Sequence, residues 1–97
     1  MIVSFRGRGT ADLFNGLNTP QARRVCPRHL WAVARRKLDL LDSAAVLSDL
    51  AAPPGNRLEQ LGGDRSGQFS IRINDQFRVC FRWTAIGPDQ VEVTDYH

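Results

Sequence analysis

The stretch that decides the fold is residues 68–83, which read QFSIRINDQFRVCFRW. Within residues 69–73 and again within 77–83, apolar side chains occupy every second position, a period typical of β-strands with one buried face. The intervening residues 74–76, Asn-Asp-Gln, favour a turn, so the two runs predict an antiparallel hairpin. The face opposite the apolar one carries Arg72, Arg78 and Arg82.

Further strands are predicted on both sides of this hairpin. Upstream, residues 57–61 indicate a strand, and the glycine-rich GGDRSG of residues 62–67 indicates a loop. Downstream, residues 86–89, IGPD, predict a turn. A last strand then begins with Val91 and Val93 on one face. Its opposite face carries Glu92, Thr94 and Tyr96.

The start of the chain predicts a short strand followed by a short helix. Residues 2–5, IVSF, have strand character and are followed by Gly7 and Gly9. Thr10 is a suitable N-cap for a helix over residues 11–17, with Asp12 in the first turn, where a carboxylate favours the helix dipole.

A longer helix is predicted from Pro27 to Ser43. Pro is a good first-turn residue, and apolar side chains recur at helical spacing at Leu30, Ala34, Leu38 and Leu41. Residues 44–52 have room for one more helical turn before the break at residues 53–56, Pro-Pro-Gly-Asn. The chain therefore predicts one α+β domain over residues 1–97, with two or three helices packed on an antiparallel meander.

The composition of the chain indicates its cellular compartment and argues against a metal site. Among 97 residues there is no apolar run near the ~20 that a membrane span needs, and the first residues do not resemble a signal peptide. We therefore expect a cytoplasmic protein. Cys26 and Cys80 are expected to be buried thiols in a reducing compartment. With no zinc-ligand spacing, neither a metal nor a cofactor is expected.

The positive charge is concentrated in one half of the chain. Residues 1–37 carry eight basic side chains and one acid, a net +7, whereas residues 38–97 carry five basic and nine acidic ones, a net −4. Twelve of the thirteen cations are arginine, whose planar fork suits phosphate. This asymmetry favours a polyanionic partner such as RNA. A solvated basic helix, or a genome that favours arginine codons, would give the same pattern.

The C-terminal residues Asp95, Tyr96 and His97, together with Arg78 on the neighbouring strand, suit RNA cleavage. A 2′-hydroxyl must lose its proton to attack phosphorus, and the leaving 5′-oxygen must gain one. Histidine titrates near neutral pH and can move either proton. Arginine can stabilise the charge of the transition state, and tyrosine can stack on a base or donate a proton. The alternative is a C-terminal tail without a role.

The chain resembles the RelE/ParE superfamily of bacterial toxins, and most closely its HigB branch. The resemblance covers nearly the whole chain. It rests on IVSF at residues 2–5, GNRL at 55–58, GDRSGQFSIRIN at 63–74, QFRVCF at 76–81 and DYH at 95–97, and on the spacing between these blocks.

This resemblance implies a RelE-like toxin fold and a metal-independent, ribosome-dependent endoribonuclease. Such a toxin cuts mRNA in the A site of the 70S ribosome and stops translation. It also implies a HigA-like antitoxin with a helix-turn-helix domain, through which alone the toxin would reach operator DNA. No membrane partner is implied.

Carried over residue by residue, Arg78 matches the family's phosphate-stabilising arginine, and Asp95, Tyr96 and His97 match its C-terminal catalytic group. Two positions depart from the pattern. Glu59 stands where some members have a histidine, and it is either a replacement general base or a solvated strand carboxylate. Gly62 stands where they have a lysine, which puts the rate of the reaction in doubt.

The remaining cations are assigned to binding. Candidate RNA contacts are Arg65, Arg72, Arg82, Arg35 and Arg36. We expect the loop around Arg65 to be mainly structural, with Arg65 adding charge. Arg23 and Arg24, like Arg35 and Arg36, are expected to touch ribosomal RNA or the antitoxin. Trp31 and Trp83 are expected to pack in or around the core.

Two other functions stay open from the sequence. The first is a toxin of the ParE type, which blocks a protein such as DNA gyrase without nuclease chemistry. The second is a degenerate toxin that only binds its antitoxin. The pair Tyr96 and His97 favours the nuclease, and the missing cation at Gly62 weakens it.

Overall fold

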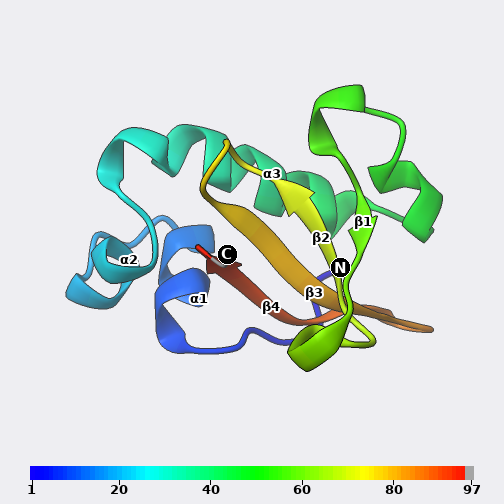
Figure 1. Cartoon of the computed structure of the whole chain (residues 1–97). Coiled ribbons are helices and arrows are strands. Elements are labelled where there is room, and N and C mark those ends of the chain that lie inside the picture. Colours follow the sequence, from blue (N-terminus) through cyan, green and yellow to red (C-terminus); the bar gives the residue numbers. More distant parts are fainter. Residues whose placement is uncertain (96–97) are drawn as a thin grey trace.

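In the computed structural model, which describes residues 1–95, helices come first and a sheet follows (Figure 1). The helices are α1 (Arg8–Phe14), α2 (Pro20–Val25) and α3 (Trp31–Ser43), and the strands are β1 (Glu59–Gln60), β2 (Phe69–Arg72), β3 (Arg78–Thr84) and β4 (Gly87–Thr94). Short 3₁₀ turns are η1 (Arg28–Leu30), η2 (Leu47–Leu50), η3 (Pro54–Asn56) and η4 (Gly63–Arg65). The strand order is β1-β2-β3-β4 with antiparallel neighbours, which confirms the predicted α+β meander.

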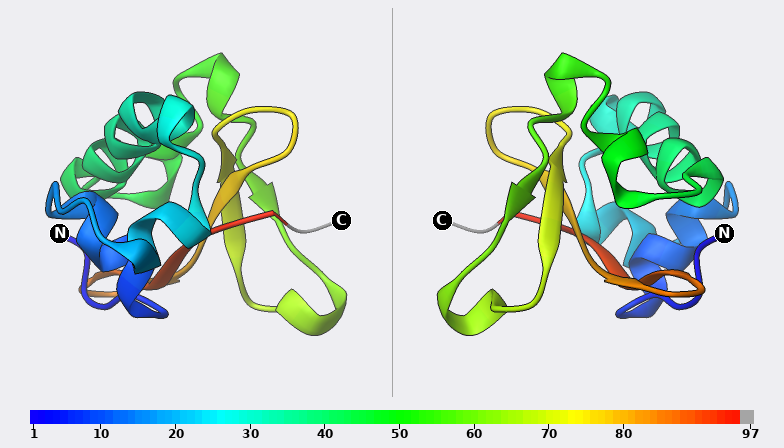
Figure 2. Two further views of the ribbon diagram at one scale, coloured as in Figure 1. Left: turned by 90° about the vertical axis from the view of Figure 1, so that its left-hand side faces the viewer. Right: turned by 90° about the vertical axis from the view of Figure 1, so that its right-hand side faces the viewer.

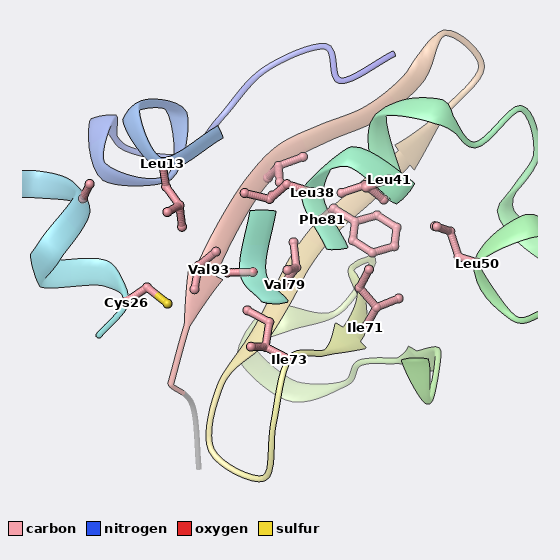
Figure 3. Packing of buried hydrophobic residues seen from close by; sticks show 13 residues of the cluster. Leu13, Cys26, Leu38, Leu41, Leu50, Ile71, Ile73, Val79, Phe81 and Val93 are labelled. Atoms are coloured by element: carbon pink, nitrogen blue, oxygen red, sulfur yellow. The ribbon is translucent and has the colours of Figure 1, made fainter. Parts of the chain in front are cut away.

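The helices gather on one side of the sheet (Figure 2). Between the helices and the sheet lies a core of fully buried side chains, among them Leu13, Leu38, Leu41, Val79 and Phe81 (Figure 3). Because side chains alternate along a strand, the residues next to these core positions occupy the other side. We call that side the open face. Its side chains include Glu59, Gln68, Ser70, Arg72, Arg78, Cys80, Arg82 and Glu92.

A bulge in β4 keeps the core side continuous. The register changes from Cys80 opposite Glu92 to Arg82 opposite Asp89, so β4 has one residue more than β3 in between. Gln90 takes up this extra residue in a left-handed conformation, with φ 53°. Such bulges re-aim the side chains that follow. Both Pro88 and Val91 are therefore buried on the core side.

The predicted first strand is wrong as a strand, because residues 2–5 form only one isolated parallel bridge, Phe5 with Val91. The segment nevertheless lies along β4. Val3 N donates to Pro88 O, and Val91 N donates to Ser4 O. The N-terminal segment thus covers the outer edge of β4, as Figure 1 shows in blue beside orange.

Helix α1 begins three residues earlier than predicted, and Thr10 is not its N-cap. Gly7 holds that position with φ 89°. Thr10 is buried inside the helix, where its Oγ1 accepts a hydrogen bond from Val93 N at 3.0 Å. The hydroxyl therefore ties α1 to the sheet. The helix ends at Phe14, short of the predicted Leu17.

The sequence interpretation missed α2. Thr19 is its N-cap, since its Oγ1 accepts from Ala22 N, and Pro20 is the first helical residue. A threonine followed by proline is a recognised helix start, so this signal was present. Thr19 Oγ1 also donates to Asp12 Oδ2 at 2.7 Å, which ties α2 to α1. The helix predicted from Pro27 to Ser43 is confirmed over Trp31–Ser43 as α3, and its first residues instead form the 3₁₀ turn η1.

Two strand boundaries also differ from the prediction. Strand β1 has two residues rather than five, and Arg57 just before it has a left-handed φ of 46°. A left-handed residue ends an extended run. Strand β4 begins at Gly87, because the tight turn falls at residues 85–86 rather than 86–89.

No helix within residues 1–95 is long and apolar enough to cross a membrane.

Helices α1 and α2 approach each other closely at Gly9. A Cβ built there would lie 2.5 Å from Gln21 O and 2.7 Å from Val25 Cγ1 of α2. Gly9→Ala should therefore lower the free energy of unfolding by about 1–3 kcal/mol, as overpacking does. Chemical denaturation monitored by circular dichroism measures this.

Gly55→Ala is the matched control for that substitution. A Cβ at Gly55 meets nothing within 4 Å. The same chemical change should leave stability unaltered or raise it by less than about 1 kcal/mol. Equal stability of the two variants would contradict the close α1–α2 contact.

Candidate functional site

Arg78 lies at the start of β3 on the open face, and its guanidinium is held by two neutral oxygens. Its Nε donates to Ser70 Oγ at 2.7 Å, and Nη2 donates to Arg57 O at 2.7 Å. The Arg78 side chain is 15% exposed. Its orientation is therefore fixed on two sides, while its charge is not neutralised by either acceptor.

Glu59 approaches the same guanidinium from β1. The register places Glu59 directly opposite Ser70, so both lie on the open face. Glu59 Oε2 lies 4.0 Å from Arg78 Nη2, and the Glu59 side chain is 55% exposed. An ion pair this long and exposed is weak. The structure thus brings together two of the predicted site residues, Arg78 and Glu59, without a close salt bridge.

The Arg57 carbonyl is held in place by its neighbour Asn56, which is fully buried. Asn56 Nδ2 donates to Leu50 O at 3.0 Å, and Asn56 Oδ1 accepts from Lys37 Nζ. Burial, and next the charges of Arg36 and Arg72, lower the pKa of Lys37. A left-handed non-glycine residue such as Arg57 persists only where its surroundings hold it, and such residues cluster at functional sites.

Arg65, a predicted RNA contact, is engaged by the protein itself. Its Nη1 donates to Glu92 Oε1 at 2.7 Å and to Gln68 Oε1 at 3.1 Å. The Arg65 and Glu92 side chains are only 23% and 18% exposed. This charged pair fastens the η4 loop across the open face to β4. Beneath it, Ser70 and Cys80 are completely buried.

Arg72 and Arg82 extend the open face at opposite ends of the hairpin. Arg72 Nη2 forms an ion pair with the exposed Asp75 in the β2–β3 turn. Arg82 is exposed, and its Nη1 lies 3.1 Å from the position of a Cβ at Gly67. Gly67 has φ 87°, so the loop passes Arg82 with a backbone that favours glycine.

Asp95 follows β4 next to Arg78, whose register partner is Thr94. Gln76 Nε2 donates to Asp95 Oδ2 at 2.7 Å, which links the chain end to the β2–β3 turn. A cavity of about 400 Å³ with a mixed polar and apolar lining opens here between α2 and β4, lined in part by Arg24, Phe77 and Asp95. The predicted catalytic residues Tyr96 and His97 lie outside the described residues.

Arg35 and Arg36 lie on α3, on the helical side of the sheet rather than on the open face. Arg35 Nη2 lies 2.9 Å from the position of a Cβ at Gly16, after α1. Arg36 borders a shallow, mostly apolar cavity of about 380 Å³ that also involves Leu40 and Pro53. The structure therefore does not bring these two arginines together with Arg78.

Sequence reasoning did not single out Ser70, the Arg57 carbonyl or Glu92. Glu92 was placed on the polar face of its strand, and the same alternation puts Ser70 on the face of Arg78, diagonally across from it, so this signal was present. The left-handed Arg57 had no sequence signal. Trp31 and Trp83 pack against the core as expected, and Trp31 Nε1 donates to Cys26 O at 2.8 Å.

Both cysteines are free and fully buried. Burial raises the pKa of the Cys26 thiol to about 11. Burial also raises the pKa of Cys80 to about 11, against the effect of Arg65, which favours the thiolate. Within residues 1–95, no three His, Cys, Asp or Glu side chains gather where a metal ion would need them.

Helices packed on one side of a four-stranded antiparallel meander are consistent with the RelE-like α+β toxin fold. The model of the HigB-like toxin family, described as the RelE-like toxin of the type II toxin–antitoxin system HigB, matches residues 4–97. The chain belongs to this family.

Two relatives are similar over part of their length. Toxin HigB-1 of Vibrio cholerae is 47% identical over 60 residues, which cover 62% of this chain and 63% of that protein. An uncharacterized protein of Haemophilus influenzae is 37% identical over 57 residues, which cover 59% of this chain and 56% of that protein. The matched segments thus span about three fifths of each relative.

The raised thiol pKa values give the second prediction. In the folded protein Cys26 and Cys80 should not react with a thiol reagent such as DTNB at pH 8, and both should react once the chain is unfolded. The pKa of each cysteine is about 11 in the folded chain and about 9 in the unfolded chain. The protonated thiols therefore make their full contribution to the free energy of unfolding below about pH 9. This stabilisation should be lost as pH rises towards 11. Rapid labelling of folded protein at pH 8 would contradict the burial.

Proposed function

We propose that this protein is a toxin that cleaves mRNA in the A site of the ribosome and thereby stops translation. Membership of the HigB-like toxin family supports this proposal. The single observation that carries it is Arg78, whose guanidinium is oriented by Ser70 Oγ and Arg57 O while keeping its positive charge. Preorganised charge of this kind stabilises a transition state without reorganising during the reaction.

In the proposed reaction the 2′-oxygen of the nucleotide before the cut attacks the adjacent phosphorus. The bond from phosphorus to the 5′-oxygen breaks, which leaves a 2′,3′-cyclic phosphate and a free 5′-hydroxyl. A base must take the 2′-hydroxyl proton, and an acid must give a proton to the leaving oxygen. Arg78 would hold the negative charge that builds up on phosphorus.

The proton transfers are assigned to the C-terminal group. Because histidine side chains generally titrate near neutral pH, His97 would move one proton, while Tyr96 would stack on a base or donate a proton. Asp95 would help to place both residues, since Gln76 fixes its carboxylate. Where the C-terminal group gives a proton to the leaving 5′-oxygen, Glu59, 4.0 Å from Arg78, would be the base that takes the 2′-hydroxyl proton in the histidine's place.

The binding surface is proposed to have two parts. Arg72 and Arg82 on the open face would contact the mRNA backbone, and Arg65, whose charge is balanced by Glu92, would lie beside the RNA and mainly fasten the loop. Arg35 and Arg36 on α3, remote from Arg78, would contact ribosomal RNA or the antitoxin. The neutralising partner is proposed to be a HigA-like helix-turn-helix antitoxin, which alone would contact operator DNA. We propose that the protein acts in the cytoplasm as one domain.

The third prediction tests the reaction and its central residue. After induction of the wild-type chain, primer extension on a translated reporter mRNA should show discrete cuts. Arg78→Ala should weaken them by about 100- to 1,000-fold, the usual cost of removing one charge-stabilising donor. Deletion of His97 should also abolish them. Arg8→Ala, which removes an exposed arginine at the start of α1, is the matched control and should cut normally.

The same experiment distinguishes the other functions. Growth arrest without cuts would reject the nuclease in favour of a toxin that blocks a protein such as DNA gyrase. Neither arrest nor cuts, with antitoxin binding retained, would indicate a degenerate toxin. Full cutting by Arg78→Ala would keep the nuclease and remove Arg78 from its site.

The fourth prediction concerns the ribosome. Few acid–base groups are available in this site, so correct placement of the mRNA must supply much of the rate. The purified chain should therefore cut ribosome-bound mRNA at least 100-fold faster than the same RNA free in solution. Equal single-turnover rates on the two substrates would contradict the proposed dependence on the ribosome.

A further inference from the structure

The Arg78 side chain must be held in one orientation if its guanidinium is to stabilise an anion effectively. Its long side chain has several rotatable bonds, and holding it in one orientation costs entropy. A transition state is stabilised well only by donors that are already in place. The groups that hold the Arg78 guanidinium must therefore fix its orientation without neutralising its charge.

The arginines on the open face differ in their partners. Arg65 donates to the carboxylate of Glu92 at 2.7 Å, and Arg72 is paired with the carboxylate of Asp75. Arg78 instead donates to a hydroxyl and to a backbone carbonyl, while the Glu59 carboxylate stays 4.0 Å away. Neutral acceptors fix a guanidinium but leave its net charge to act on an anion.

Ser70 is well suited to hold such a group. It lies in β2 between two partners, Glu59 of β1 and Cys80 of β3, so the sheet fixes its backbone on both sides. Its side chain is completely buried, and a buried hydroxyl is costly unless it is hydrogen-bonded. Ser70 Oγ therefore presents a rigid acceptor to Arg78 Nε from beneath.

The second acceptor is rigid for a different reason. Arg57 has a left-handed backbone, and its neighbour Asn56 is locked by Leu50 and Lys37. The carbonyl of Arg57 thus comes from a turn that is anchored to the helical side of the molecule. The two acceptors belong to separate elements, η3 with its following residue and β2, and they meet at Arg78.

We propose that Ser70 is a positioning residue, which acts through Arg78 by fixing the guanidinium towards the scissile phosphate of RNA. The Arg57 carbonyl is the second half of the same device. This inference rests on the proposed function, because it assigns the phosphodiester as the anion that Arg78 meets. Ser70 itself does not touch the reacting atoms.

A double-mutant cycle in the full-length chain tests this inference. Ser70→Ala should lower the single-turnover rate on ribosome-bound mRNA about tenfold, the effect of losing one hydrogen bond to a charged group. Binding to the ribosome should change little. In the Arg78→Ala background, the same Ser70→Ala substitution should cause no further loss, because the residue acts only through Arg78.

Two further variants separate positioning from a loss of folding. Ser70→Thr keeps the hydroxyl and should restore most of the rate. Cys80→Ala also truncates a fully buried open-face side chain beside Ser70, but it removes neither of the two Arg78 acceptors. It should reduce thermal stability while keeping the rate of the folded protein. An equal loss from Ser70→Ala in both backgrounds, or no loss at all, would overturn the proposal.

A readout without cleavage separates this proposal from the function on which it rests. The ¹⁵N order parameter of Arg78 Nε should be high in the wild-type chain and should fall in Ser70→Ala. If the chain cuts no mRNA but this drop occurs, the proposed function fails and the positioning by Ser70 stands. If the chain cuts mRNA and Arg78 Nε is equally ordered in both proteins, the positioning proposal fails alone.

Discussion

The site depends on the two hydrogen bonds that hold the Arg78 guanidinium against Ser70 Oγ and Arg57 O. These bonds exist only if β2 and β3 pair in the observed register and if the chain before β1 turns left-handed at Arg57. The first condition follows from the core: Ile71, Val79 and Phe81 face the helices, which forces Ser70 and Arg78 onto the open face. The second accompanies the buried Asn56, which bonds to Leu50 and Lys37 beside Arg57. The packing of the apolar side thus sets the chemistry of the polar side.

Charge on the open face is arranged unevenly around this arginine. Arg65 and Glu92 form an ion pair whose charges cancel. The pair holds the η4 loop against β4 and contributes little to the net charge of the open face. Glu59 approaches Arg78 without a close contact, at 4.0 Å. With Gly62 where the resemblance leads one to expect a lysine, the proposed site would depend more on Arg78 to stabilise a phosphate. The orientation of the Arg78 guanidinium would then matter more in this chain.

The hairpin of residues 68–83 could be predicted because its period of two is long and regular, and the same pattern placed Arg72, Arg78 and Arg82 on one face. Thr10 was misjudged because a residue that suits an N-cap also suits a buried hydroxyl that accepts from Val93 N. Helix α2 was missed although Thr19 and Pro20 signal a start, since its six residues carry no helical stripe. The left-handed Arg57 and the bulge at Gln90 could not be predicted, because tertiary contacts rather than residue type impose them.

The most direct test of the central claim is a thio effect on cleavage by ribosome-bound toxin. Replacing one non-bridging oxygen of the scissile phosphate by sulfur weakens it as a hydrogen-bond acceptor, so cleavage of the sulfur substrate should be slower if a protein donor bonds to that oxygen. Single-turnover cleavage of the oxygen and sulfur substrates should differ strongly for the wild-type chain. The difference should nearly vanish for Arg78→Ala. The same ratio of rates in both proteins would show that Arg78 does not meet the phosphate, and would contradict the account.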